Sequence, residues 1–112
     1  MRYILSMISN YSDWQAMTPE QAQAFDAKIT AFNDDLRKAG AWVSAEGLGE
    51  PSEGKTVRFE DGNASVGDGP YVDRPDQFGG FWIIEAATID EAVEWARKAP
   101  LTRGAIEVRQ LV

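Results

Sequence analysis

The sequence predicts one α+β domain, residues 1–112, in the order strand, helix, strand, hairpin, strand, helix, strand. Three observations support this fold class. Two segments carry apolar residues at helical spacing behind cap signals, four others have the alternating or doubly apolar pattern of strands, and Asp61-Gly62-Asn63 is a hairpin turn signal. A length of 112 residues also matches a single domain of the common size, about 100–150 residues.

The first three elements come from the N-terminal half. Met1–Ser9 alternates between two largely apolar faces, which indicates a strand covered on both sides. The next segment, "MTPEQ", predicts a helix with Thr18 as N-cap, Pro19 at the first helical position and Gln21 at the capping-box spacing. Gly40 is expected to end this helix. One core-facing stripe is formed by Phe25, Ile29, Phe32 and Leu36.

The remaining elements follow in the same way. "AWVSAEGLGE" predicts a strand with one face formed by Trp42, Ser44, Glu46 and Leu48. "KTVRFEDGNASV" predicts the hairpin, and "GGFWIIEAA" predicts a strand that is apolar on both faces. Thr88, with Glu91 three residues later, opens a second helix that ends before Pro100, and its expected buried stripe is Ile89, Ala92, Val93 and Ala96. "GAIEVRQLV" predicts the last strand.

With the hairpin taken as an insertion, this order is the split β-α-β arrangement called ferredoxin-like, βαββαβ. Two helices would cover one face of the sheet and leave the other face open, although the strands are apolar on both faces. Soluble monomers rarely expose a large apolar surface. We therefore expect a second copy to cover this face in a two-fold homodimer.

The composition restricts the chemistry. The chain has no cysteine and no histidine, which excludes thiolate catalysis, imidazole bases and Cys- or His-type metal sites, and we expect neither a metal nor a cofactor. Eighteen acidic against eleven basic residues give a formal charge of −7, which argues against nucleic acid as a partner. Neither a membrane span nor a signal peptide is recognisable, so we expect a cytoplasmic protein without a membrane partner.

The stretch "GDGPYVDRPDQFGGFWIIE" places turn residues and acids before an apolar strand. Asp68 is either an Asx-turn residue or a catalytic base, and the Tyr71 side chain either packs under the loop or donates its hydroxyl to a ligand. The pair Gly79-Gly80 predicts a bulge or a close backbone approach. Read functionally, these glycines leave room for a ligand beside Trp82, whose structural alternative is a place in the core.

Charged residues on the expected strands give the other candidates. Glu85 lies inside an apolar strand, and Glu107 and Arg109 alternate on one face of the last strand. An ion pair in the sheet or across the dimer would explain them structurally. In the functional interpretation, Arg109 anchors a carboxylate ligand and a glutamate acts as base. Arg58 and Glu46 are weaker candidates of the same kind.

The segments "AEGLGEP", "VRFEDGNASVGDGPY", "DQFGGFWIIEAATIDEAVEWARKAP" and "GAIEVRQLV" resemble the YCII-related, DGPF-type proteins over nearly the whole chain. The name-giving tetrapeptide occurs here as Asp68-Gly69-Pro70-Tyr71. The resemblance implies a dimeric α+β barrel in a bacterial family whose biochemical activity is not established, with some members linked to sigma factors. The His–Asp pair proposed as a catalytic site for the wider family cannot be carried over, because this chain has no histidine.

Three classes of function follow. The first is a homodimeric binding or accessory protein that takes a small organic ligand. The second is a cofactor-free enzyme, isomerase-, lyase- or oxygenase-like, with Asp68 or a glutamate as base and Arg109 or Tyr71 stabilising negative charge. The third is a regulatory module with a protein partner in sigma-factor signalling, which rests on the resemblance alone. The absence of histidine and cysteine favours the first class.

Overall fold

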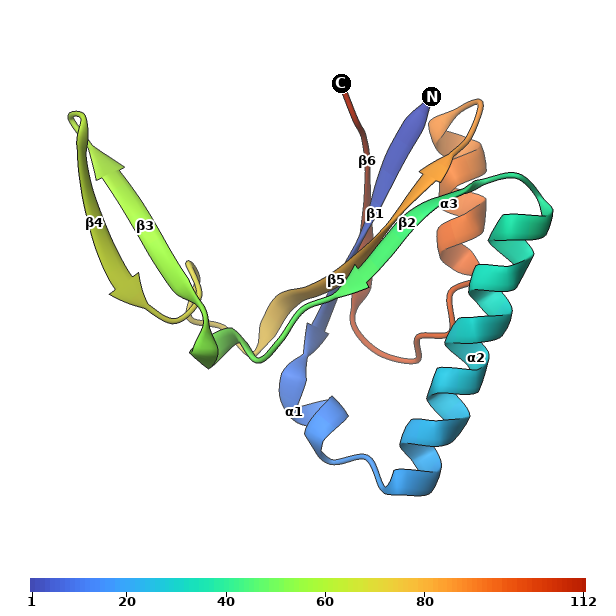
Figure 1. The fold of residues 1–112 in the computed structure, drawn as a ribbon, viewed down its shortest axis with the longest axis horizontal. Coiled ribbons are helices and arrows are strands. Elements are labelled where there is room, and N and C mark those ends of the chain that lie inside the picture. The colour runs from blue at the N-terminus through green and yellow to red at the C-terminus, as the bar shows by residue number, and fades with distance from the viewer.

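The computed structural model describes residues 1–112 and contains a four-stranded antiparallel sheet, a separate two-stranded hairpin and three α-helices (Figure 1). The sheet has the order β2-β5-β1-β6, with bounds β1 Arg2–Asn10, β2 Trp42–Gly47, β5 Asp76–Glu85 and β6 Ala105–Gln110. The helices are α1 Tyr11–Gln15, α2 Pro19–Lys38 and α3 Ile89–Arg97, and the hairpin is β3 Lys55–Glu60 with β4 Asn63–Asp68. This arrangement confirms the predicted ferredoxin-like α+β fold with an inserted hairpin. None of the helices combines the length and hydropathy that crossing a membrane requires.

Side-chain caps set the starts of both long helices, as predicted. Thr18 Oγ1 accepts a hydrogen bond from the Gln21 amide at 3.1 Å, and Gln21 Oε1 accepts one from the Thr18 amide at 3.0 Å. Thr88 Oγ1 accepts from the Glu91 amide at 3.2 Å at the start of α3. Gly40, with φ +73°, follows the end of α2 in the left-handed conformation expected there. Both helices lie along the same face of the sheet (Figure 1).

The hydrophobic core lies between the sheet and these two helices. The Phe32 ring meets the Trp82 ring edge-on, with 5.2 Å between the centroids, and Trp82 Nε1 donates to Asn33 Oδ1 at 2.8 Å. The buried apolar residues come from both sheet and helices: Tyr3, Leu5, Phe32, Leu36, Ala41, Trp82, Ile84, Ala86 and Ala92. On β1 and β5 the buried positions alternate, so every second side chain points away from the helices.

Two expected packing patterns are wrong in detail. The register between β2 and β5 shifts between Trp42 and Ser44, so Trp42 packs against the core under the Arg37 guanidinium, while Ser44 pairs with Ile83 on the other face. The bulge therefore breaks the single face expected for β2. Ile89, expected in the buried stripe of α3, is 48% exposed because it is the first helical residue and the covered part of the helix begins one turn later.

The face of the sheet opposite the helices is covered by no element of this chain. Across β1 and β5, Ile4 pairs with Ile83 and Ser6 pairs with Phe81. We call this surface the open face; its positions, taken from the strand pairings, are Arg2, Ile4, Ser6, Ile8, Ser44, Glu46, Phe78, Phe81, Ile83, Glu85, Ala105, Glu107 and Arg109. The open face is therefore apolar along its centre and charged at its margins.

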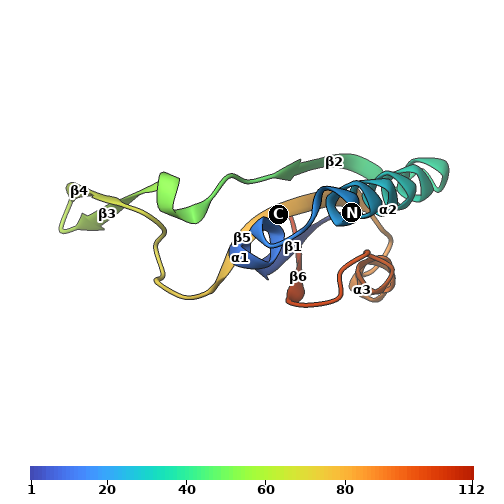
Figure 2. The same cartoon turned by 90° about the horizontal axis from the view of Figure 1, so that it is seen from below.

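The hairpin β3–β4, residues Lys55–Asp68, projects from the side of the sheet opposite the helices, as Figures 1 and 2 both show. We call it the arm. Asp61 and Gly62 have φ values of +50° and +82°, which makes the turn between its strands a tight two-residue connection. The extended arm raises the radius of gyration to 15.9 Å, compared with about 13 Å for a compact chain of this length.

Candidate functional site

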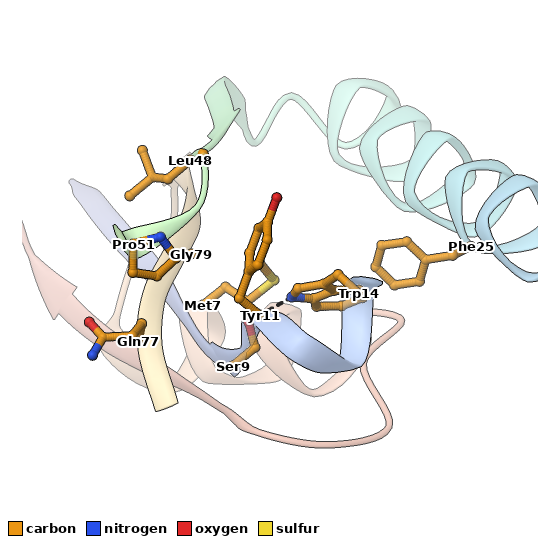
Figure 3. A pocket seen from close by; sticks show the side chains of 10 residues that line it. Met7, Ser9, Tyr11, Trp14, Phe25, Leu48, Pro51, Gln77 and Gly79 are labelled. Atoms are coloured by element: carbon orange, nitrogen blue, oxygen red, sulfur yellow. Dashed lines mark hydrogen bonds between the residues drawn. The ribbon is translucent and has the colours of Figure 1, made fainter. Parts of the chain in front are cut away.

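A cavity of about 200 Å³ lies at the end of the helix-covered face, where β1, α1, α2, β5 and the segment after β2 meet (Figure 3). Its lining is formed by Met7, Ser9, Tyr11, Trp14, Phe25, Leu48, Gly49, Pro51, Gln77 and Gly79. None of these side chains is charged. A concave site with apolar walls and few polar groups is the usual form of a small-molecule site in proteins.

A bulge in β5 forms the floor of the cavity. Met7 pairs with Gly80 and Ile8 pairs with Phe78, so Gly79 is the extra residue between two regular pairs. A Cβ atom on Gly79 would lie 3.2 Å from Ser9 Oγ and 3.5 Å from Met7 Cε. The missing side chain therefore allows the β5 backbone to lie close to Ser9 and Met7. The predicted bulge at the glycine pair is confirmed, and Gly79 lines the cavity on the helix-covered face.

Helix α1 forms the aromatic wall. Asn10 Oδ1 accepts a hydrogen bond from the Ser12 amide at 3.0 Å and caps this short helix directly after β1. Trp14 is thereby turned back onto the sheet, where its Nε1 donates to Ser9 Oγ at 3.0 Å and its ring lies 4.9 Å from the Phe25 ring. Figure 3 shows the Tyr11 ring standing in the cavity with its hydroxyl directed away from Ser9.

The polar side-chain groups of the lining are the hydroxyls of Ser9 and Tyr11, the Trp14 indole N–H and the Gln77 amide. Trp14 Nε1 already donates to Ser9 Oγ, and Gln77 Nε2 already donates to the Val72 and Arg74 carbonyls. Ser9 is only 6% exposed, and because its oxygen accepts from Trp14, its hydroxyl hydrogen remains free to donate to a bound molecule. No base is available to activate Ser9 as a nucleophile, since its one partner is an indole N–H. The chemistry of the cavity is therefore apolar enclosure with hydrogen bonds from one or two hydroxyls.

The Asp68-Gly69-Pro70-Tyr71 segment lies at the root of the arm, outside the cavity. The Asp68 carboxylate accepts from Lys55 Nζ at 2.6 Å instead of from a loop amide. Gly69 has φ +87°; its amide donates to the Gly54 carbonyl at 2.8 Å, and its carbonyl accepts from Thr56 Oγ1 at 2.9 Å. The segment thus closes the two strands of the arm at their base.

Arg58 and Tyr71 are brought together by this closure. The Arg58 guanidinium lies over the Tyr71 ring, 4.8 Å from its centroid, and Arg58 Nη2 donates to the Tyr71 carbonyl at 3.3 Å. The Tyr71 side chain is 70% exposed. A shallow hollow lined by Tyr71 adjoins the cavity, because both include Leu48, Gly49, Pro51 and Gln77 in their linings.

The remaining predicted site residues lie on the sheet. Glu107 and Arg109 are exposed on the open face, where they pair with Ser6 and Ile4 of β1, and neither forms an ion pair within the chain. Trp82 lies in the core on the opposite face, 5% exposed. The structure therefore separates the predicted residues into the arm root, the open face and the core.

Glu85 is held at the edge of the open face by two cations. The N-terminal ammonium lies 3.2 Å from Glu85 Oε2, and Arg2 Nε lies 3.2 Å from Oε1. Hydrogen bonds from the N-terminal ammonium, and then from Arg2, lower the pKa of Glu85, while partial desolvation opposes them.

The lowered pKa predicts how Glu85 affects stability as pH changes. Because the folded pKa is below the unfolded one, the contribution of Glu85 is present above the unfolded pKa and is lost as pH falls through the folded pKa. We expect wild type to melt slightly higher than Glu85→Gln at pH 7 and the two melting curves to converge at pH 2. An equal difference at both pH values would contradict this assignment.

Sequence reasoning did not find the cavity, because its aromatic wall is on α1, a five-residue helix too short to show a repeating stripe. A signal was nevertheless present. Asn10 is a strong N-cap residue directly before Tyr11 and Trp14, whose three-residue spacing places both rings on one side of a helical turn. Ser9 gave no signal, since its position under Trp14 depends on the register of β1 and β5.

An antiparallel four-stranded sheet with its helices on one face, an open second face and an inserted arm defines the class as ferredoxin-like α+β proteins. The chain belongs to the YCII-related domain family, whose family model matches residues 1–112. It is also similar to an uncharacterised protein of Rhizobium meliloti (strain 1021), with 28% identity over 114 residues that cover 99% of this chain and 92% of the relative. The family resemblance drawn from the sequence is thereby confirmed.

Proposed function

We propose that the protein is a homodimeric small-molecule-binding protein and that it takes an uncharged, ring-sized organic molecule in the cavity beside Ser9 and Trp14. The observation that carries this proposal is the uncharged lining, in which aromatic and aliphatic side chains surround two hydroxyl groups and the amide of Gln77. Neither a base nor a nucleophile with a base lies in this wall. Binding without turnover is therefore the function that the cavity supports best.

The size of the cavity limits the ligand. An apolar cavity of about 150 Å³ holds benzene in other proteins, and this cavity of about 200 Å³ leaves room for one ring with a small substituent. A charged substituent would lose its hydration without gaining an ionic partner, which costs several kcal/mol. A hydroxyl or an indole N–H, in contrast, can hydrogen-bond to the hydroxyl of Ser9 or Tyr11.

The exposed surface of the protomer supports the dimeric part of the proposal. One chain has an accessible surface of 7874 Å², whereas a monomer of its 12.4 kDa mass exposes about 6,100 Å². The difference of roughly 1,700 Å² is more than the approximately 800 Å² that each partner buries in a standard interface. Covering the open face with a second copy would remove its apolar centre from water and give Glu46, Glu107 and Arg109 partners across the two-fold axis.

A thermal-shift measurement with two matched compounds tests the ligand class. We expect benzyl alcohol and indole at millimolar concentration to raise the melting temperature, while benzoate, which has the same ring and a carboxylate, leaves it unchanged. A ligand at one hundred times its Kd stabilises the folded state by about 2.7 kcal/mol, which is several degrees for a domain of this size. Stabilisation by benzoate alone would contradict an uncharged site.

Two glycine variants locate the binding site. Gly49 lines the cavity, and a Cβ atom there meets no atom within 4 Å, so Gly49→Leu can place a side chain in the opening without backbone strain. Gly47 has the same freedom at the end of β2 and does not line the cavity. We expect Gly49→Leu to abolish the shift and Gly47→Leu to retain it. Equal responses of the two variants would place the ligand elsewhere.

A further inference from the structure

We infer that the arm is an interaction surface for a second copy of this chain: the apolar side of each arm packs against the partner protomer. This inference rests on the proposed homodimer and goes beyond it, because an interface between the open faces alone would leave both arms in solvent. It assigns a role to β3 and β4, which form neither the core nor the cavity.

The two sides of the arm differ in chemistry. Val57 pairs with Val66 and Phe59 pairs with Ala64, so these four side chains share one side of the arm. We call it the apolar side; at the arm root it ends with the Lys55–Asp68 ion pair. Phe59 is 76% exposed, Val66 67% and Val57 49%. Such strict alternation on an antiparallel pair is typical of a ribbon with one side packed and one side solvated.

The polar side already has its contacts within the chain. Arg58 stacks on Tyr71, and Thr56 donates to the Gly69 carbonyl, both on residues of the segment at the arm root. Ser65 lies opposite Arg58 on this same side. The apolar side touches the root segment only through the Lys55–Asp68 ion pair at its base, and its four apolar residues beyond this pair are exposed.

An arm in this exposed state needs a partner to be stable. A two-stranded hairpin without a packed face is marginally stable in water. Its exposed apolar side adds to the excess accessible surface of the protomer and would otherwise favour nonspecific association. Burial of Phe59 and Val66 against a protein surface would stabilise the hairpin and would also prevent nonspecific association.

The position of the arm points to a second copy as that partner. The arm projects from the open-face side of the sheet (Figures 1 and 2), so a protomer that covers the open face also comes within reach of the arm. A standard interface uses about 20–30 residues from each partner, and the open face supplies roughly half of that number. The arm is the adjoining surface that can supply the remainder, and two-fold symmetry covers both arms in the same step.

Packing of the arm against the partner protomer would also hold one wall of the cavity in place. Leu48, Gly49 and Pro51 line the cavity and lead directly into β3 through the short 3-10 helix Pro51–Glu53. The orientation of the arm and the position of this wall therefore depend on the same few backbone angles. A partner that holds the arm thus also holds this wall of the cavity in place.

Single cysteines on the two sides of the arm test the inference, because the chain has none of its own. Ala64→Cys places a thiol on the apolar side and Ser65→Cys places one on the polar side; both positions are exposed in the protomer. The rate of reaction with a maleimide is measured for each variant well above and well below the dimer dissociation constant. We expect the Ala64→Cys rate to fall at least tenfold in the dimer and the Ser65→Cys rate to change less than about twofold.

Three other outcomes of the maleimide experiment would each contradict a different part of the inference. A dimer in which Ala64→Cys reacts as fast as in the monomer leaves the apolar side free and refutes the arm contact while the proposed dimer stands. Protection of both thiols refutes the assignment to one side. A monomer at every concentration refutes the dimer as well. As a second measurement, Phe59→Ser should raise the dimer dissociation constant at least tenfold, whereas Glu60→Ser on the polar side should change it less than threefold.

Discussion

Gly104→Ala is expected to destabilise the protein by about 3 kcal/mol, from the strain of a left-handed residue together with overpacking. Gly104 has φ +86°, and a Cβ atom there would lie 2.2 Å from the Ile8 carbonyl oxygen, a backbone atom that cannot rotate away. The strand pair Ile8–Ala105 begins directly after this glycine. Chemical denaturation of wild type and variant measures the change in the free energy of unfolding.

Gly40→Ala is the matched control for this prediction. Gly40 has nearly the same conformation, φ +73°, but a Cβ atom there meets nothing within 4 Å. Its cost is the conformational strain alone, about 1–2 kcal/mol. Equal destabilisation by the two variants would show that Gly104 does not lie close to the Ile8 carbonyl in solution. The start of β6 would then have to be placed differently.

Phe81→Asp is expected to raise the dimer dissociation constant at least a hundredfold, about 2.7 kcal/mol. Phe81 lies on β5 at the centre of the open face, with its ring 6.2 Å from that of Phe78. An aspartate there would be buried against the partner with no cation beside it, and central aromatic residues carry much of the energy of an interface. Sedimentation velocity over a range of concentrations measures the constant.

The helical side of the protomer provides the control for Phe81→Asp. Ala27 is exposed on α2, on the side of the sheet away from the proposed interface. Ala27→Asp adds the same charge and should leave the dissociation constant within about threefold of wild type. If both variants weaken association equally, the effect comes from added net charge, and the open face is not the interface.

The fold could be predicted from the sequence because its signals are local. Thr18 with Gln21 and Thr88 with Glu91 mark helix starts that the structure confirms by their hydrogen bonds. The order of strands and helices then selects the ferredoxin-like topology. The face of Trp42 was mispredicted because a bulge is a property of the pairing between β2 and β5, which the spacing within β2 does not contain.

The cavity could not be predicted because it depends on non-local geometry. Ser9 and Trp14 come together through α1, and Gly79 faces Ser9 only because β1 and β5 pair in one particular register. The sequence did indicate unusual backbone at Gly79-Gly80. Which face of the sheet Gly79 lines depends on where the extra residue falls in the ladder, and that position becomes visible only in the paired strands.

The partners of the charged candidate residues could not be predicted either, because they too depend on non-local geometry. Glu85 was expected to need a cationic partner, and it has two, but one of them is the N-terminal ammonium, which no motif contains. Glu107 and Arg109 were predicted to share a face, and they do so on the open face of β6. Their partners across a dimer remain a prediction, because a protomer sequence specifies which residues share a face and not what covers it.

The mass of the wild-type protein in solution tests the central claim, the two-fold dimer closed over the open face, most directly. Sedimentation velocity at micromolar concentration is expected to give one species of twice the 12.4 kDa chain mass. A species of 12.4 kDa that persists up to about 100 μM would contradict the dimer, and the open face and the arm would then need a different partner.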